Sequence, residues 1–517
     1  MNTTDFLSIA NAICPERDCV VFGEERWTYS RVNDRVNQLA NALAGRGIEK
    51  GNCIGMLQVN CNQYIETYFA AAKLGAIFVP LNFRAKADEL TYMINHAQVK
   101  VLFVGGRYLD LVRSIKPQLP TLKESISIEG GADLTYKDFV SSAPLDEMAS
   151  DIGDEDVTIL MYTSGTTGRP KGVPLAHNAF VSYVLENVDP ANPEIAERNL
   201  LTVPLYHVAG IQAMLAAIYG GRTLVLMKQF EVKEWMETIQ RERATRAMLV
   251  PTMLKRVIDD PDFTRYDLSS LKVITYGAAP MPFEVIHKAI QVMPWARFIN
   301  AFGQTETAST ITTLSPEDHI IEGTEEEKAK KLKRLTSSIG KPLPDVEVKI
   351  VDDEGKALPP LGVGEILAKG PRIMTGYWRD EQKTSQVMTG DGWLRTGDMG
   401  YIDEEGYVYL TGRMDDMIIR GGENISPEEV EDVLHSHPRV EEASVIGIPD
   451  VEWGQEVRAV VVLKRGETAT PEEIMEHCRE RLAGFKRPRS VVFVDALPRN
   501  PMGKVLRKKL REEYGKP

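Results

Sequence analysis

Short apolar runs alternate with amphipathic stretches over about the first 330 of the 517 residues. We predict buried strands for the runs at 99–105, 157–160, 222–227, 246–251 and 271–277, with helical stretches such as VIHKAIQVM between them. Strands buried on both faces and separated by helices are typical of α/β folds with largely parallel sheets. The length suffices for about three domains.

The pattern changes near residue 315. The segment SPEDHIIEGTEEEKAKKLKRL is highly charged and places Glu326 and Glu327 four residues before Lys330 and Lys331. Ion pairs at this spacing support an exposed helix, although a lid is an alternative. The alternation in DVEVKIVDDEGKAL and GEILAKGP then predicts antiparallel strands.

The last hundred residues resemble a separate α+β unit, joined near GRMDDMIIRGG. Helices are predicted to begin after Ser426 and Thr470, each with proline at the first helical position and glutamate at the third. This arrangement predicts two capping boxes. ASVIGIP, VRAVVVL and SVVFV are predicted to be the strands.

Composition narrows the classes of function. The net charge of −13 argues against general nucleic-acid binding. Five cysteines without a CxxC spacing favour a reduced, cytoplasmic compartment. The first residues lack the pattern of a signal peptide, and YFAAAKLGAIFVPL is predicted to be a buried helix followed by a strand, so we expect no membrane-spanning segment. The sequence is compatible with a homodimer and does not determine the oligomeric state.

The segment YTSGTTGRPKGV, residues 162–173, gathers hydroxyls, glycines and Lys171. Glycine lets the backbone approach a ligand, and successive exposed N–H groups form anion-binding nests. The segment is not a Walker P-loop, because Pro170 precedes Lys171 and Gly172 follows it. It therefore predicts a polyphosphate site of another type, with a plain surface loop as the alternative.

YTSGTTGRPKGV resembles the phosphate loop of the adenylate-forming superfamily, which contains acyl-CoA synthetases, adenylation domains of peptide synthetases and beetle luciferases. Four further segments match in the family's order: YGAAP (276–280), NAFGQTET (300–307), residues 393–431 and PRNPMGKVLRKKL (498–510). The resemblance implies a large α/β N-terminal domain (1–414) of stacked αβαβα layers with a small β-barrel subdomain at about 335–414. It also implies a small mobile α+β C-terminal domain (415–517) with its hinge at Asp415.

The resemblance also implies site residues. The catalytic residues would be Lys504, Thr163, Glu306 and Lys171, with Glu306 near Mg²⁺. The nucleotide would be bound by Thr163, Ser164, Gly165, Thr166, Thr167, Gly168, Lys171, Gly277, Ala278, Ala279, Pro280, Asn300, Ala301, Phe302, Gly303, Gln304, Thr305, Asp398, Arg413 and Lys504. Taken alone, Glu306 could be a cap or an ion-pair partner and Asp398 could cap a turn.

Two further groups follow from the same resemblance. The acyl pocket would be lined by His207, Val208, Ile211, Tyr276 and Ala308, with Ala301 and Phe302 in its apolar wall. CoA would be bound by Arg84, Gly421, Gly422, Glu423 and Lys486. Arg84 and Lys486 could equally be surface charges, and His207 a buried, satisfied histidine.

The implied activity is an ATP-dependent carboxylic acid–CoA ligase that forms an acyl-adenylate and releases AMP and pyrophosphate. PLYHVAG (204–210) lacks the aspartate with which amino-acid-activating members pair the substrate amine. A medium- or long-chain, alicyclic or aromatic acid is therefore expected. The alternatives are a stand-alone ligase that loads a carrier protein, a luciferase-like oxidase, and a nucleotide sensor without turnover.

Overall fold

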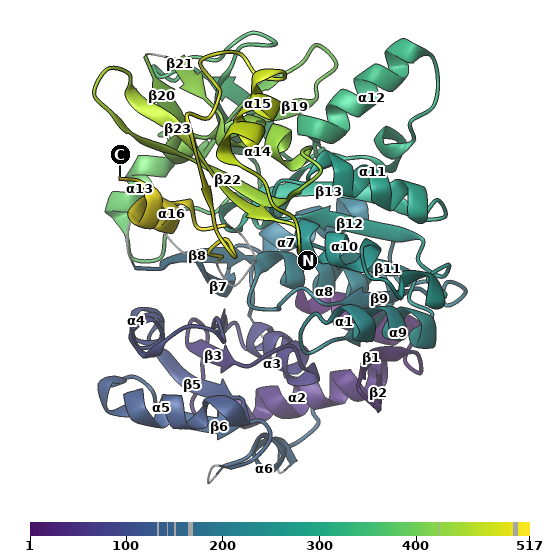
Figure 1. Cartoon of the computed structure of the whole chain (residues 1–517). Helices are drawn as coiled ribbons and strands as arrows, with labels where there is room; N and C mark the ends of the chain where they lie inside the picture. Colours follow the sequence, from purple (N-terminus) through teal and green to yellow (C-terminus); the bar gives the residue numbers. More distant parts are fainter. Residues whose placement is uncertain are drawn as a thin grey trace.

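The computed structural model describes residues 1–131, 134–141, 143–148, 151–163, 169–421, 423–499 and 505–516, without the side chains of Asp415 and Asn424. Seven predicted site residues lie outside this description: Ser164, Gly165, Thr166, Thr167, Gly168, Gly422 and Lys504. Figure 1 shows the chain with its elements labelled.

The smaller of the two large sheets has the strand order β6-β5-β3-β4-β7-β8. Its strands are β3 (Cys53–Leu57), β4 (Ile77–Pro80), β5 (Val99–Val104), β6 (Glu124–Ser127), β7 (Val157–Thr163) and β8 (Lys171–Ala176). They are parallel except for the last pair, β7 and β8. Every residue of β3 and β4 is buried, as expected of parallel strands covered on both faces.

The larger sheet has thirteen strands, and its centre is parallel in the order β13-β12-β11-β9-β10-β1. These strands are β1 (Asp18–Phe22), β9 (Arg198–Leu201), β10 (Thr223–Leu226), β11 (Arg246–Leu249), β12 (Val273–Gly277) and β13 (Arg297–Gln304), with β2 (Glu25–Thr28) at the edge. The parallel sheets predicted from the apolar runs are confirmed.

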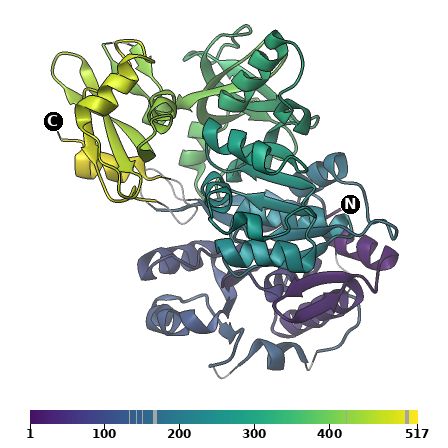
Figure 2. The same cartoon turned by 45° about the vertical axis from the view of Figure 1, so that its right-hand side comes forward.

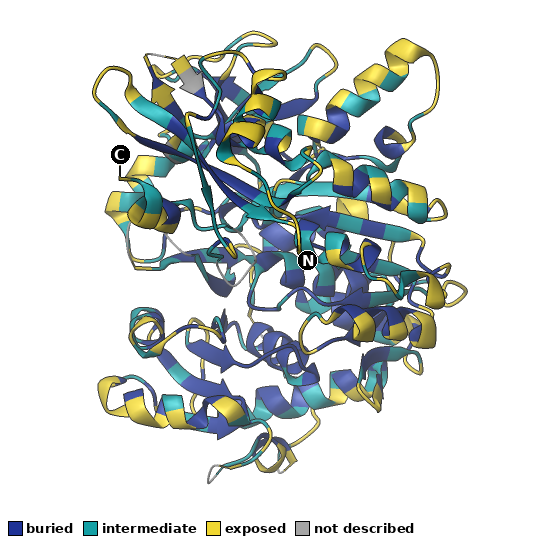
Figure 3. Ribbon diagram, in the orientation of Figure 1, coloured by how far each residue is buried: buried dark blue, intermediate teal, exposed yellow. Residues whose placement is uncertain are grey.

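The N-terminal region has five layers, which are held together by three large hydrophobic cores. One core lies between the sheets and contains residues of α1 (Thr4–Ile13), α2 (Tyr29–Gly45), α3 (Asn62–Lys73), α7 (His177–Asn187) and α8 (Val208–Tyr219). The outer face of the large sheet packs on α9 (Val232–Glu242), α10 (Pro251–Ile258) and α11 (Phe283–Val292). The outer face of the smaller sheet packs on α4 (Ala87–Ala97) and α5 (Leu109–Ile115). The predicted αβαβα stack is confirmed, with exposed residues on its outer helices (Figure 3).

The large sheet continues into antiparallel strands after β13. They are β14 (Ser309–Leu314), β15 (Ser338–Pro342), β16 (Glu347–Val351), β17 (Gly364–Lys369), β18 (Leu394–Ile402) and β19 (Val408–Arg413). The charged segment forms α12 (Glu325–Ser337), and Lys330 pairs with Glu326 at 3.5 Å. The predicted Glu327–Lys331 pair is wrong. The Glu327 carboxylate accepts a hydrogen bond from Thr324 N, and Lys331 Nζ donates to Ile320 O at 2.8 Å.

The C-terminal residues form a body beside the rest (Figure 2). It contains β20 (Ile418–Arg420), β21 (Glu423–Ile425), α14 (Pro427–His435), β22 (Val440–Asp450), β23 (Gly454–Leu463), α15 (Pro471–Arg479), β24 (Ser490–Phe493) and α16 (Arg507–Tyr514). The capping box at Thr470 is confirmed. At Ser426 the box is incomplete: the Ser426 side chain accepts from Glu429 N, but the Glu429 carboxylate pairs with Lys486 at 2.7 Å.

Two further expectations concern membrane-spanning helices and the state of the cysteines. YFAAAKLGAIFVPL forms the end of α3 and then β4, as predicted. Within the described residues, no helix is both long enough and apolar enough to cross a membrane. All five cysteines are buried and free.

Candidate functional site

The two strands that flank the predicted phosphate loop hold its described ends together. Thr163, the last residue of β7, pairs with Lys171, the first residue of β8. The Lys171 Nζ donates to the Tyr377 hydroxyl at 3.2 Å and lies 4.7 Å from the centroid of its ring. The ammonium group of Lys171 is therefore placed by an aromatic side chain more than two hundred residues away in the sequence.

Glu306 contacts the same tyrosine hydroxyl. It belongs to a short 3₁₀ turn, η4 (Thr305–Thr307), which follows β13, and it is 8% exposed. The Tyr377 hydroxyl donates to Glu306 Oε1 at 3.0 Å, and the Met374 N–H donates to the Glu306 carbonyl oxygen at 2.9 Å. Burial, followed by the Glu306 charge, raises the pKa of Tyr377 well above its usual value, so this hydroxyl keeps its proton.

Asp398 and Arg413 face each other across neighbouring strands. They are register partners on β18 and β19, and Arg413 Nε lies 2.8 Å from Asp398 Oδ1. The Asp398 side chain is 5% exposed and the Arg413 side chain 41%. Gln304 Nε2, at the end of β13, donates to the Thr396 carbonyl oxygen at 3.2 Å and lies 3.5 Å from Asp398 Oδ2.

These contacts form one polar row, which consists of Lys171, Tyr377, Glu306, Gln304, Asp398 and Arg413. Gln304 and Glu306 are separated by one residue, so the turn after β13 joins the two halves. The row places a cation at one end, buried carboxylates in the middle and a guanidinium at the other end. Such an arrangement can bind a ligand that carries both phosphate groups and hydroxyls.

Close backbone approach explains the glycines of this region. A side chain at Gly277 would lie 2.1 Å from Ala301 O, and one at Gly303 would lie 1.5 Å from Ser309 O. Ala278 and Ala308 adopt the left-handed conformation, with φ +67° and +46°. Strained non-glycine residues cluster at functional sites more often than elsewhere. The other predicted nucleotide residues lie in β13, η4 or the turn after β12: Asn300, Ala301, Phe302, Thr305, Ala279 and Pro280.

Three of the predicted acyl-pocket residues lie in one core. Val208, Ile211 and Ala308 belong to the cluster between the two sheets. The structure does not bring Tyr276 to them: its side chain lies in the core on the outer face of the large sheet, with its hydroxyl 2.8 Å from His319 Nε2. The direction of a side chain on a strand alternates, and Tyr276 points to the other face.

His207 immediately precedes α8. Its ring centroid lies 4.0 Å from that of Tyr206, and within the described residues its buried Nε2 has no hydrogen-bond partner. Burial, followed by the positive charge of Arg84, lowers the pKa of His207 to about 3. The imidazole is therefore neutral at pH 7 and offers a donor or an acceptor rather than a charge.

The predicted CoA residues are spread over the two halves of the chain. Arg84 is exposed and lies over the Phe83 ring at 5.4 Å. Gly421 and Glu423 are exposed in the small C-terminal body, and Gly421 donates its N–H to Trp453 O at 2.8 Å. Lys486 pairs with Glu429 of the same body. The structure does not bring Arg84 and Lys486 into contact.

Tyr377 is the residue that sequence reasoning missed. It connects Lys171 to Glu306, yet it follows them by 206 and 71 positions. No spacing rule links the three residues, and only the packing of residues 374–378 against β8 places it there, since Trp378 N donates to Gly172 O at 2.8 Å. A structure was needed to find it.

The described residues contain no group of three or more His, Cys, Asp or Glu side chains that could hold a metal ion. One buried carboxylate, that of Glu306, is linked to Lys171 by the Tyr377 hydroxyl, which hydrogen-bonds both side chains. Mg²⁺ commonly binds through one or two carboxylates together with substrate phosphates and water, so this donor set fits Mg²⁺ brought with a polyphosphate.

Known proteins match the chain along nearly its whole length. Models named AMP-binding enzyme and AMP-binding enzyme C-terminal domain match residues 9–378 and 429–504. The chain is 33% identical to the fatty acid–[acyl-carrier-protein] ligase ScoC of Streptomyces coeruleorubidus, over 94% of this chain and 91% of the relative. It is 32% identical to the indoleacetate–CoA ligase of Aromatoleum aromaticum, over 99% and 98%.

Among solved structures, the anthranilate CoA ligase AuaEII in complex with anthranoyl-AMP has a TM-score of 0.90 and 30% identity, and the match covers 100% of this chain and 97% of that one. The two family models match consecutive parts of the chain. The chain therefore belongs to the AMP-binding enzymes of the adenylate-forming superfamily.

Proposed function

We propose that this protein is an ATP-dependent acid–thiol ligase that converts a carboxylic acid to its CoA thioester with release of AMP and pyrophosphate. The observation that carries the proposal is the polar row from Lys171 to Arg413. It contains five described residues to which the resemblance assigns catalysis or nucleotide binding: Lys171, Glu306, Gln304, Asp398 and Arg413. The family membership and the CoA ligases among the relatives support it.

Lys171 and the loop before it would bind the β- and γ-phosphates of ATP. Asp398, already buried and acceptor-only, would accept hydrogen bonds from the ribose hydroxyls, while Arg413 stays partly exposed beside it. Glu306 would hold Mg²⁺ together with phosphate oxygens, and the ion would supply charge neutralisation.

In the first half-reaction, a carboxylate oxygen attacks the α-phosphorus of ATP and the bond to the β-phosphate oxygen breaks. The acid is ionised at pH 7 and needs no general base. Lys171 and Lys504 would neutralise the two anions that must meet in line, which is the main requirement of phosphoryl transfer. Pyrophosphate leaves, and an acyl-adenylate remains.

In the second half-reaction, the CoA sulfur attacks the acyl carbonyl carbon, the thiol proton is lost, and AMP leaves with the electrons of the broken anhydride bond. We propose that residues 415–517 rotate about Asp415 between the two steps, so that Lys504 leaves and Gly421, Gly422 and Glu423 approach. Arg84 and Lys486 would bind the phosphates of CoA. One site could thereby serve two reactions.

The acid would be of medium or long chain, alicyclic or aromatic. Val208, Ile211 and Ala308 offer an apolar wall, and the neutral His207 closes it without adding a charge. An α-amino acid would need a carboxylate for its amine, and Tyr206 and His207 stand where such a group is expected. The free, buried thiols agree with a cytoplasmic location.

Loading of a carrier protein is a second candidate, because the relative ScoC carries that name at 33% identity. Exchange of labelled pyrophosphate into ATP, screened over short, medium, long, alicyclic and aromatic acids, tests the adenylation step. AMP release that depends on CoA then supports the proposal. Exchange with a transfer only to a phosphopantetheinyl protein would favour the second candidate, and ATP binding without any acid-dependent exchange would contradict both.

A further inference from the structure

A cavity of about 360 Å³ lies at the N-terminal ends of three strands of the smaller sheet. Cys53 begins β3, Lys100 is the second residue of β5, and Lys123 immediately precedes β6. Trp378 and Arg379 reach the same cavity from far along the chain. Cys53 and Lys123 thus lie at the opposite end of this sheet from Thr163, the last residue of β7.

The wall of this cavity carries three cations and no anion. Lys100, Lys123 and Arg379 line it, and none of its described lining residues is an aspartate or a glutamate. Lys100 Nζ donates to Asn52 Oδ1 at 2.8 Å, and an Arg379 guanidinium nitrogen donates to Gln98 Oε1 at 2.8 Å. Because neutral amides hold these cations, the lining leaves their charge uncompensated, in a chain whose net charge is −13. A concave surface of this kind concentrates anions.

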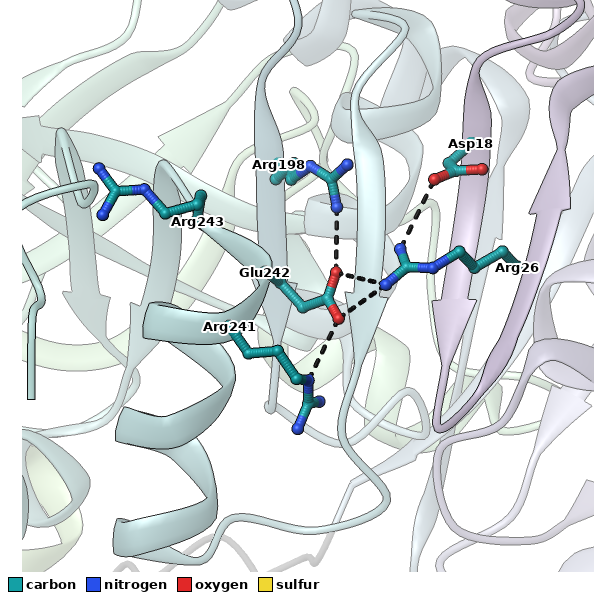
Figure 4. Close-up of a pocket in the computed structure, with 6 residues that line it drawn as sticks. All are labelled: Asp18, Arg26, Arg198, Arg241, Glu242 and Arg243. Carbon is teal, nitrogen blue, oxygen red and sulfur yellow. Dashed lines mark hydrogen bonds and ion pairs between the residues drawn. The ribbon is translucent and has the colours of Figure 1, made fainter.

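A second cavity, of about 370 Å³, shows the contrast (Figure 4). Its arginines surround a carboxylate of its own, since Glu242 is 3% exposed and lies 2.9 Å from Arg26 and 3.0 Å from Arg198. Asp18 lies 3.6 Å from Arg26. The second cavity thus has two carboxylates among its four arginines, whereas the described lining of the first cavity has no carboxylate.

The backbone of the first cavity is strained at two of its polar residues. Gln98 has φ +57° and Arg379 has φ +53°, and neither is a glycine. Their side chains hydrogen-bond each other although 281 positions separate them. Gln98 is the left-handed residue that ends α4, a common way for a helix to end, and Arg379 lies in a turn.

Two donors in the same wall also lack acceptors. The Thr121 hydroxyl and the Trp378 indole nitrogen are buried, and neither has a hydrogen-bond partner within the described residues. Buried donors are nearly always paired in folded proteins, so each such group needs an explanation.

We propose that this cavity binds a small phosphate-bearing anion. The three cations match a dianionic phosphate group, and the volume lies within the range of small-molecule sites. The binding itself does not depend on the proposed ligase activity.

The experiment uses the full chain labelled with 5-fluorotryptophan. The six tryptophans of the chain give separate ¹⁹F signals, and the Trp378→Phe variant identifies the signal of Trp378. Inorganic phosphate is titrated, and potassium chloride at matched ionic strength is the reference. We expect a saturable shift of the Trp378 signal. The double variant Lys100→Gln/Lys123→Gln should raise the apparent Kd at least about tenfold. Lys137→Gln, at an exposed lysine of the helix Tyr136–Ser141, should leave the apparent Kd unchanged.

The phosphate loop is the competing location for the probe. A Trp378 shift that persists in Lys171→Ala and weakens in the double lysine variant supports the cavity. A shift that disappears in Lys171→Ala but survives in the double variant overturns the proposal, as does the absence of any saturable shift. If the double variant does not fold, Lys123→Gln alone, at an exposed position, must weaken binding at least about threefold. Because the readout is binding, its failure would leave the ligase proposal untouched.

Discussion

The two halves of the candidate site belong to regions that are built differently. Glu306 and Asp398 are buried in the large N-terminal region, each with a partner in that region. Gly421 and Glu423 are exposed on the small C-terminal region. Among the described residues, the hydrophobic clusters of the C-terminal region begin at Ile418 and share no member with the others. The nucleotide half is thus held among the cores of the N-terminal region, and the other half is carried by a separate body.

Among the described residues, polar contacts link the two regions. Lys255 of α10 pairs with Glu441 of β22 at 2.5 Å. The 3₁₀ turn η6 (Met414–Asp416) joins the regions, and Asp416 is bound to Arg507 at 3.2 Å and to Arg511 at 3.1 Å. Asp416 is therefore tied to α16 in the C-terminal region, which supports a hinge at Asp415, immediately before it.

The largest expected effect tests the assignment of Lys504. Lys504→Ala should slow adenylation by about 10²–10³-fold, because it removes a charge that stabilises the transition state. Thioester formation from supplied acyl-adenylate should be spared. Pyrophosphate exchange and single-turnover thioester assays measure the two steps. Lys509→Ala, which removes a lysine of the exposed pair with Glu513, should leave both rates unchanged. Equal loss in both steps would contradict the division of labour.

The opposite selectivity is expected at Gly421. A side chain there would come within 2.7 Å of the Trp453 ring, and φ is +61°. Gly421→Leu should slow thioester formation about tenfold or more, since the strain is roughly 1–3 kcal/mol, and leave adenylation near the wild-type rate. Gly466→Leu is the matched control, because Gly466 has φ +84° but no atom within 4 Å of the added carbon. Equal slowing of thioester formation in both variants would assign the loss to backbone strain alone.

Tyr377→Phe should have an intermediate effect that is confined to the fixed region. The change removes the hydroxyl that joins Lys171 to Glu306. Hydrogen bonds to charged groups contribute about 1.5–3 kcal/mol, so adenylation should slow about tenfold or more, measured as kcat/KM for ATP. Tyr266→Phe, at a half-buried tyrosine outside the polar row, serves as control. Wild-type kinetics for Tyr377→Phe would show that the polar row does not position Lys171.

The smallest effect is expected where the regions touch. Lys255→Met should change the ratio of the adenylation and thioester rates by less than about fivefold, because partly exposed ion pairs contribute about 0.2–1 kcal/mol. The charge-reversed pair Lys255→Glu/Glu441→Lys should restore the ratio. Lys233→Met removes an ion pair with Asp262 within the N-terminal region and should not change it. A failure of the reversed pair to restore the ratio would separate this contact from domain movement.

The same comparison explains what the sequence could predict. Apolar runs and helix caps depend on neighbouring residues, so the layers, β12, β23 and the cap at Thr470 were predictable. Contacts between distant segments were not. Tyr377 contacts Lys171 only because the fold brings them together, and the Glu429 carboxylate pairs with Lys486 instead of with its own helix end. Tyr276 faces the outer core because of its register on the strand. These contacts are set by packing, which a local sequence pattern does not contain.

The central claim is that the row from Lys171 to Arg413 binds ATP. A crystal structure of the full chain with a non-hydrolysable ATP analogue tests it most directly. We expect the phosphates beside Lys171 and the ribose hydroxyls within hydrogen-bond distance of Asp398. A nucleotide found in another cavity, with both of these residues unoccupied, would contradict the account.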